Sequence, residues 1–107
     1  QAQQSWQALA PAQQQEMNSI TALWQDLANK GHAGAQRALG AIYAQGHGVP
    51  KNLRKAVQWY RLAAKQGHAQ AQFSLGNMIY DGQGVEKNDK EAVQWYRSAA
   101  EQGHAQA

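Results

Sequence analysis

The chain has 107 residues, of which 43% are hydrophobic and 16% are charged, a length that suits one small domain and excludes two independent cores. It contains no cysteine, which excludes a disulfide framework and thiolate chemistry. The formal net charge of +3 predicts a mildly basic surface, and no apolar run reaches the length of a membrane span. Alanine and glutamine are abundant and favour helix, so we expect an all-α protein without membrane insertion.

Residues 1–30 form an N-terminal polar segment and a capping helix, which together make a degenerate half-repeat. The start is rich in glutamine, and its apolar anchors are Trp6 and Leu9. From Pro11 onward, apolar residues recur at helical spacing and predict a helix that covers the end of the next unit. These apolar residues are Met17, Ile20, Trp24 and Leu27. The chain begins with Gln1, which leaves open a removed export signal.

A period of 36 residues organises the rest of the chain. The tripeptide Gly-His-Ala recurs at this spacing, and fixed spacing of this size indicates a solenoid. Two units cover residues 31–66 and 67–102, and 21 of their 36 aligned positions are identical. Residues 103–107 repeat the start of a unit. We therefore expect two stacked units and the beginning of a further one.

Each unit contains the signals of a helix, a turn and a second helix. In the second unit, apolar residues at helical spacing precede the turn Gly82-Gln83-Gly84, whose glycines tolerate positive φ. Asn88 then caps a helix over 89–102, and Glu91 three residues later suggests a reciprocal capping box. Gly103 follows as the expected C-terminal cap. In the first unit Asn52 and Gly67 take the same roles.

These residues resemble the Sel-one-like repeat (SLR) family, a relative of the tetratricopeptide repeat. The resemblance rests on Leu75-Gly76, Gly82-x-Gly84-Val85 and Ala92-Val93-x-Trp95-Tyr96-x-x-Ala99-Ala100-x-x-Gly103-His104-Ala105. One departure is Ile79, where the family usually has the tyrosine that the first unit supplies as Tyr43. The resemblance implies an alpha-alpha superhelix, a right-handed solenoid of antiparallel helix pairs. Such proteins are common in the bacterial envelope and act by binding other proteins.

Positions that differ between the two units are candidates for binding, because stacking dictates the identical ones. The differences cluster on the first helix of each unit, which by resemblance lines the concave face. We expect a partner protein or peptide segment to contact Arg37, Gln70, Phe73, Asn77, Tyr80 and Asp81. Aromatic and arginine side chains are enriched at interface hot spots. The alternative is that Phe73 and Tyr80 pack within the repeat.

Two other recurring sets are interpreted as structural. The aromatic pairs fall on the same helix face as the Ala-Ala pairs and predict core packing; they are Trp59, Tyr60, Trp95 and Tyr96. The histidines of successive units lie too far apart to share a metal, and His47 is a lone loop residue. We expect turn residues and no metal site at His32, His68 and His104.

No catalytic group of residues is present. No serine lies in a nucleophile elbow, and the glycine pairs lack the rest of a phosphate loop, so we expect no catalytic residues and no cofactor. Basic residues interleaved with acidic ones argue against nucleic acid as a partner.

The sequence therefore predicts a non-enzymatic scaffold that binds a partner protein through its concave face. We expect a periplasmic or exported bacterial adaptor or an immunity or inhibitor protein, with a cytoplasmic location as the alternative. A second function class is a cell-wall or glycan-binding module that uses Trp6 and Trp24. The last helix lacks its sequence neighbour beside Trp95 and Ala99, which predicts self-association or further repeats at this end.

Overall fold

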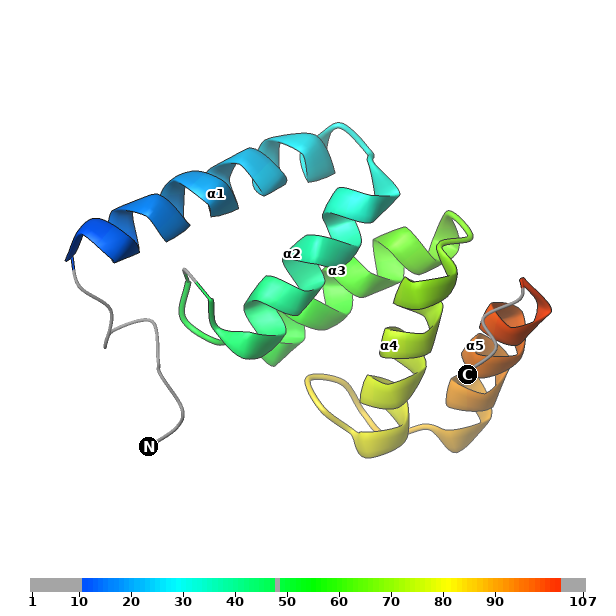
Figure 1. Ribbon diagram of the computed structural model, residues 1–107. Coiled ribbons are helices and arrows are strands. Elements are labelled where there is room, and N and C mark those ends of the chain that lie inside the picture. Colours follow the sequence, from blue (N-terminus) through cyan, green and yellow to red (C-terminus); the bar gives the residue numbers. More distant parts are fainter. Residues whose placement is uncertain (1–10, 48, 103–107) are drawn as a thin grey trace.

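The computed structural model describes residues 11–47 and 49–102, with side chains from residue 19 onward (Figure 1). This part of the chain folds into five helices and confirms the all-α prediction. The helices are α1 (Pro11–Asn29), α2 (Ala33–Gln45), α3 (Leu53–Lys65), α4 (Ala69–Asp81) and α5 (Asp89–Glu101). Expectations for Trp6, Leu9, Gly103 and His104 lie outside the described residues.

Each helix packs against the next one along the chain, and α2/α3 and α4/α5 form two helix pairs. In Figure 1, α2 and α4 lie toward the viewer, and α3 and α5 lie behind them. The chain therefore builds two layers, with first helices in front and second helices behind. None of the described helices is long and apolar enough to cross a membrane.

Asparagine caps begin the second helix of each pair. The side-chain oxygen of Asn52 accepts a hydrogen bond from Lys55 N–H at 3.0 Å, and Asn88 accepts one from Glu91 N–H at 3.0 Å. The reciprocal half of the expected capping box is wrong, because Asn88 N–H donates to the carbonyl of Ile79 at 3.2 Å. The Glu91 carboxylate therefore does not cap its own helix and can accept a hydrogen bond from another helix of the chain.

Glycine ends the first helix of each pair. Gly46 and Gly82 have φ of 75° and 69°, so the chain leaves α2 and α4 in a left-handed conformation that side chains disfavour. Gly84, farther along the second turn, also has a positive φ of 73°. A Cβ there would collide with the Leu53 carbonyl oxygen and would lie 2.9 Å from Arg54 N. The loop after α4 therefore rests directly on the start of α3.

The core lies between the layers and is built from small residues around a few large ones. Leu39, Leu75 and Ile79 are the largest fully buried side chains. A Cβ on Gly40 would lie 2.6 Å from the Tyr60 ring, and one on Gly76 would lie 2.8 Å from the Tyr96 ring. The absence of a side chain at these two positions lets each tyrosine ring pack flush against the opposite helix.

The expected core role of the aromatic pairs is confirmed. Tyr60 is buried, and Trp59, Trp95 and Tyr96 are partly buried against the core clusters. Tyr60 is more deeply buried than Tyr96 because α4 packs on α3, whereas no described helix packs on the same side of α5. The paired valines show this difference, since Val57 is 5% exposed and Val93 is 47% exposed.

Helix α1 packs on α2 through a face that agrees only in part with the sequence analysis, since the expected Leu27 does pack against the cluster of Ala28, Ala35 and Leu39. Thr21 and Ala28 are buried, whereas Ile20 and Trp24 are 48% and 36% exposed. Leu23 is 63% exposed beside them. The expectation that Ile20 and Trp24 cover the next unit is therefore wrong. The contact combines the small residues Ala28 and Ala35 with Leu39 of α2.

Candidate binding surface

Five of the six predicted binding residues lie on α4. We call the side chains of Gln70, Phe73, Asn77, Tyr80 and Asp81 the α4 surface. Four of them are exposed, and Phe73 is half-buried. Residues three, four or seven positions apart share one side of a helix, so these side chains form a continuous strip.

Phe73 and Asn77 are both tied to Tyr96 of α5. The rings of Phe73 and Tyr96 have centroids 5.7 Å apart at an interplanar angle of 49°. The Tyr96 hydroxyl donates a hydrogen bond to the side-chain oxygen of Asn77. Phe73 therefore packs within the repeat and also contributes to the strip, so a substitution there would change the packing as well as the surface.

Tyr80 is the most exposed aromatic ring on α4 that the structure describes, at 49%. The Lys87 ammonium lies 4.3 Å from its ring centroid and donates to the Tyr80 carbonyl at 2.7 Å. Lys87 also pairs with Asp89 at 2.7 Å, and this hydrogen bond is the main cause that raises the pKa of Lys87. One face of the Tyr80 ring is thus in contact with the loop after α4.

Arg37 lies on α2, apart from the strip on α4. Burial raises the pKa of the Tyr60 hydroxyl, and the positive charge of Arg37 opposes this shift. Burial also lowers the pKa of His68, and Arg37 adds to that effect. The charge of Arg37 therefore acts on a tyrosine of α3 and on the histidine that precedes α4.

His32 and His68 occupy N-cap positions, which agrees with the role expected for them beside turns. The Nδ1 atom of His68 accepts a hydrogen bond from Ala71 N–H at 3.1 Å. His32 holds the same position before α2 but makes no side-chain capping bond. Within the described ranges, no group of three His, Asp or Glu side chains is placed to hold a metal ion.

Buried glutamines join the helices in a way that the sequence analysis missed. Gln36 donates to the Ala28 carbonyl at 3.2 Å, and Gln72 donates to the Ala64 carbonyl at 3.0 Å. Each of these amides also accepts a hydrogen bond at 2.8 Å from a glutamine 30 residues later. The later glutamines are Gln66 and Gln102. The two glutamine pairs recur in register and satisfy buried polar groups at each helix junction.

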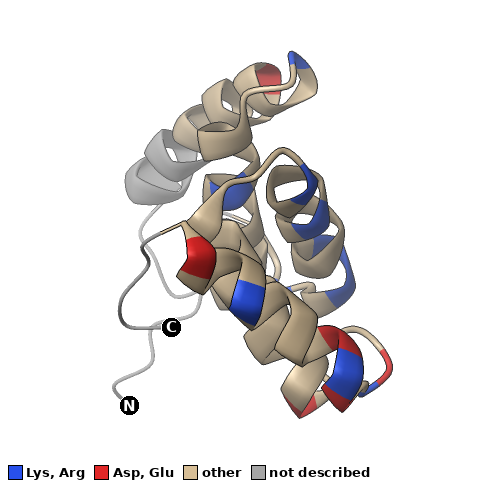
Figure 2. Ribbon diagram, turned by 90° about the vertical axis from the view of Figure 1, so that its right-hand side faces the viewer, with Lys and Arg blue, Asp and Glu red and all other residues tan. Residues whose placement is uncertain are grey.

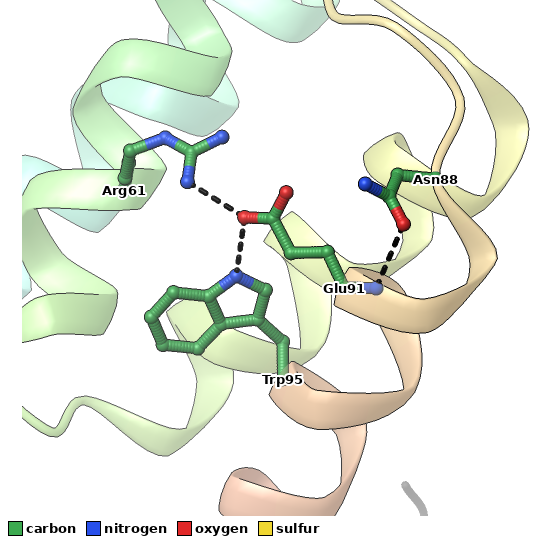
Figure 3. Close-up of polar contacts among 4 residues, drawn as sticks. All are labelled: Arg61, Asn88, Glu91 and Trp95. Atoms are coloured by element: carbon green, nitrogen blue, oxygen red, sulfur yellow. Dashed lines mark hydrogen bonds and ion pairs between the residues drawn. The ribbon is translucent and has the colours of Figure 1, made fainter.

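A second missed group joins the two helix pairs (Figure 3). The Glu91 carboxylate accepts a hydrogen bond from the Arg61 guanidinium at 2.8 Å and from the Trp95 indole at 3.2 Å. The Arg61 bond is the main cause that lowers the pKa of Glu91, with a smaller contribution from Trp95. The first unit has Lys55 where the second has Glu91, so comparing the units gave no signal for this pair.

We expect this pair to make stability depend on acid pH. Because the folded pKa of Glu91 lies below the unfolded value near 4.5, its contribution is complete above that pH and is lost as the pH falls through the folded value. The pair is partly exposed, so we expect Glu91→Gln to cost less than about 1 kcal/mol at pH 7.

Urea unfolding of wild type and Glu91→Gln at pH 7, 4.5 and 3 tests this expectation. The difference in unfolding free energy should shrink toward pH 3, while other carboxylates cancel because both proteins contain them. A difference that stays constant across this range would contradict the role given to the ionised carboxylate.

Comparison with known families gives two adjacent matches to the Sel1 repeat, over residues 33–68 and 69–104. Together they cover more than half of the chain. The chain belongs to the Sel1 repeat family. No curated protein is significantly similar to this Sel1 repeat chain.

Solved structures of other Sel1 repeat proteins are similar to the fold. A Sel1 repeat protein from Oxalobacter formigenes superposes with a TM-score of 0.81 and 44% identity, over 83% of this chain and 37% of that one. The protective antigen c5321 of uropathogenic Escherichia coli has a TM-score of 0.81 and 37% identity, over 83% and 19% of the two chains. Helicobacter pylori cysteine rich protein B has a TM-score of 0.79 and 31% identity, over 82% and 66%.

This Sel1 repeat chain spans less than half the length of the first two of these proteins. Sel1 repeat proteins are typically protein-interaction scaffolds, and the family is mostly non-catalytic.

Proposed function

We propose that this chain is a non-enzymatic scaffold that binds a segment of a partner protein, and that the α4 surface makes the contact. The observation that carries the proposal is the Tyr80 ring, which is 49% exposed and already held by Lys87. A large aromatic ring that loses little freedom on binding is a typical hot-spot residue. Asn77 and Asp81 flank it with polar groups that select the register of the partner.

We further propose that the protein acts as an adaptor or an inhibitor outside the bacterial cytoplasm. The similar solved structures come from bacterial proteins, and one of them, c5321, is described as a protective antigen. The repeat fold supplies a rigid frame for such a role, because each helix is fixed by its neighbours. The cell-wall alternative stays a prediction that depends on Trp6 and Trp24.

Replacing Tyr80 with alanine should weaken partner binding with little loss of stability. The substitution removes an exposed ring but keeps the carbonyl that accepts the Lys87 hydrogen bond. We therefore expect the unfolding free energy to change by less than about 1 kcal/mol, while binding weakens about tenfold or more. Phe73→Ala is a poorer probe, because it also removes the ring contact with Tyr96.

Affinity capture from the source cells should compare wild type, Tyr80→Ala and Val93→Ala, with identification by mass spectrometry. Val93 is 47% exposed on α5 and serves as a matched control for the loss of exposed apolar surface. A protein retained by wild type and Val93→Ala but lost by Tyr80→Ala would support the proposal. Equal retention by all three would remove the α4 surface as the binding site.

A further inference from the structure

Positive charge is concentrated on one helix of this protein. Residues 51–65 contain five of the ten lysines and arginines, and no aspartate or glutamate occurs anywhere from residue 51 to residue 80. Figure 2 shows Lys and Arg bands along α3 with no acidic band among them, whereas both signs occur along α5. The interleaving of charges expected from the sequence therefore holds for α5 and is wrong for α3.

Two of these five cations already have partners. Arg61 pairs with Glu91 at 2.8 Å, and the Lys55 ammonium lies 5.3 Å from the Tyr43 ring centroid. The other three, Lys51, Arg54 and Lys65, are exposed and make no ion pair with any described residue. The protein thus holds a set of uncompensated cations close to one another in the sequence.

The free cations share the solvent-facing side of α3. The buried side of this helix contains Ala56, Val57, Tyr60, Ala63 and Ala64. At 100° per residue, the opposite side carries what we call the basic face, formed by Arg54, Gln58, Leu62 and Lys65, with Lys51 just before the helix.

The basic face includes one large apolar side chain. Leu62 is 47% exposed one turn before Lys65 and about 12 Å along the helix from Arg54. These two cations are eleven residues apart, which corresponds to about 16 Å along a helix. A ligand that matches this face carries negative charge at both ends and an apolar group between them.

We propose that the basic face of α3 binds an acidic, amphipathic segment of a partner protein. Carboxylates that flank an apolar side chain would meet Arg54 and Lys65 while the apolar side chain covers Leu62. The Arg54 guanidinium suits a carboxylate because it can donate two parallel hydrogen bonds. A nucleic acid fits less well, because a row of closely spaced phosphates offers no apolar group to cover the exposed leucine.

This surface is separate from the α4 surface, because α3 lies in the other layer of the fold (Figure 1). The inference therefore does not depend on the proposed function.

The test is a binding titration with a fluorescein-labelled acidic peptide in which glutamates flank two leucines. Fluorescence anisotropy at about 50 mM salt should show binding to wild type, and binding should weaken as the salt concentration rises. We expect Arg54→Glu/Lys65→Glu to weaken it by about tenfold or more, and Leu62→Ser to weaken it several-fold. Circular dichroism melts confirm that each variant is folded.

A matched control changes the net charge equally at another place. Lys90→Glu/Arg97→Glu alters two exposed cations of α5 and should leave the affinity for the peptide within about twofold. Equal weakening by the two double variants would overturn the proposal, because it would indicate attraction by net charge alone. Absence of binding to wild type, or tighter binding of a single-stranded DNA of equal charge, would also overturn it.

Discussion

Replacing Gly40 with alanine is expected to destabilise the protein by about 1 to 3 kcal/mol, although alanine is the better helix former. The new Cβ would lie 2.6 Å from the Tyr60 ring, well inside the contact distance of two carbons. Tyr60 is 7% exposed and enclosed by the core, so its ring has no space into which it can move. Thermal or urea unfolding monitored by circular dichroism measures the loss.

Two other helix glycines provide the controls for this prediction. Gly34→Ala on the same helix meets nothing within 4 Å and should stabilise the protein by up to about 1 kcal/mol. Gly76→Ala places its Cβ 2.8 Å from the Tyr96 ring, but that ring is half-buried and less enclosed than Tyr60. We expect a loss smaller than that of Gly40→Ala, and the reverse order would contradict the packing argument.

Replacing Gly84 with alanine should cost about 2 to 4 kcal/mol, because two separate penalties add. The residue has a φ of 73°, which side chains rarely adopt, and its Cβ would collide with the backbone of α3. The atoms in the way are the Leu53 carbonyl and Arg54 N, which cannot rotate aside as a side chain can. Urea unfolding gives the free energy directly.

Gly67→Ala separates the two penalties. Gly67 has a φ of 89°, but a Cβ there meets nothing within 4 Å, so only the conformational cost of about 1 to 2 kcal/mol applies. Gly84→Ala should therefore lose more than Gly67→Ala. If both lost the same amount, the loop after α4 would be free to leave α3, and the contact would contribute nothing to stability.

The sequence predicted those parts of the fold that depend on neighbouring residues or on the repeat. The caps at Asn52 and Asn88 and the glycine ends of α2 and α4 follow from local backbone chemistry. The recurrence of Tyr60 as Tyr96 indicated core packing, because stacking imposes the same requirement on every unit, whereas the contacts of these rings with Gly40 and Gly76 required coordinates.

Contacts that differ between units, or that involve common residues, were not predictable in this way. The Arg61 and Glu91 pair exists only where the second unit departs from the first. Gln36 and Gln72 repeat, but glutamine is so frequent in this chain that two buried amides do not stand out. For the candidate site, the residues of the α4 surface were chosen from unit differences alone, and the role of Lys87 beside Tyr80 required coordinates.

Two contacts connect α3 to parts of the chain beyond α4. The Gly84 loop rests on the start of α3, and Arg61 of α3 holds Glu91 of α5. Opening the second helix pair would therefore remove support from the first, so α3, α4 and α5 should unfold together as one cooperative unit. A partner that pulls on α4 must then unfold α3, α4 and α5 together. The force that the complex withstands is therefore set by three helices and not by one.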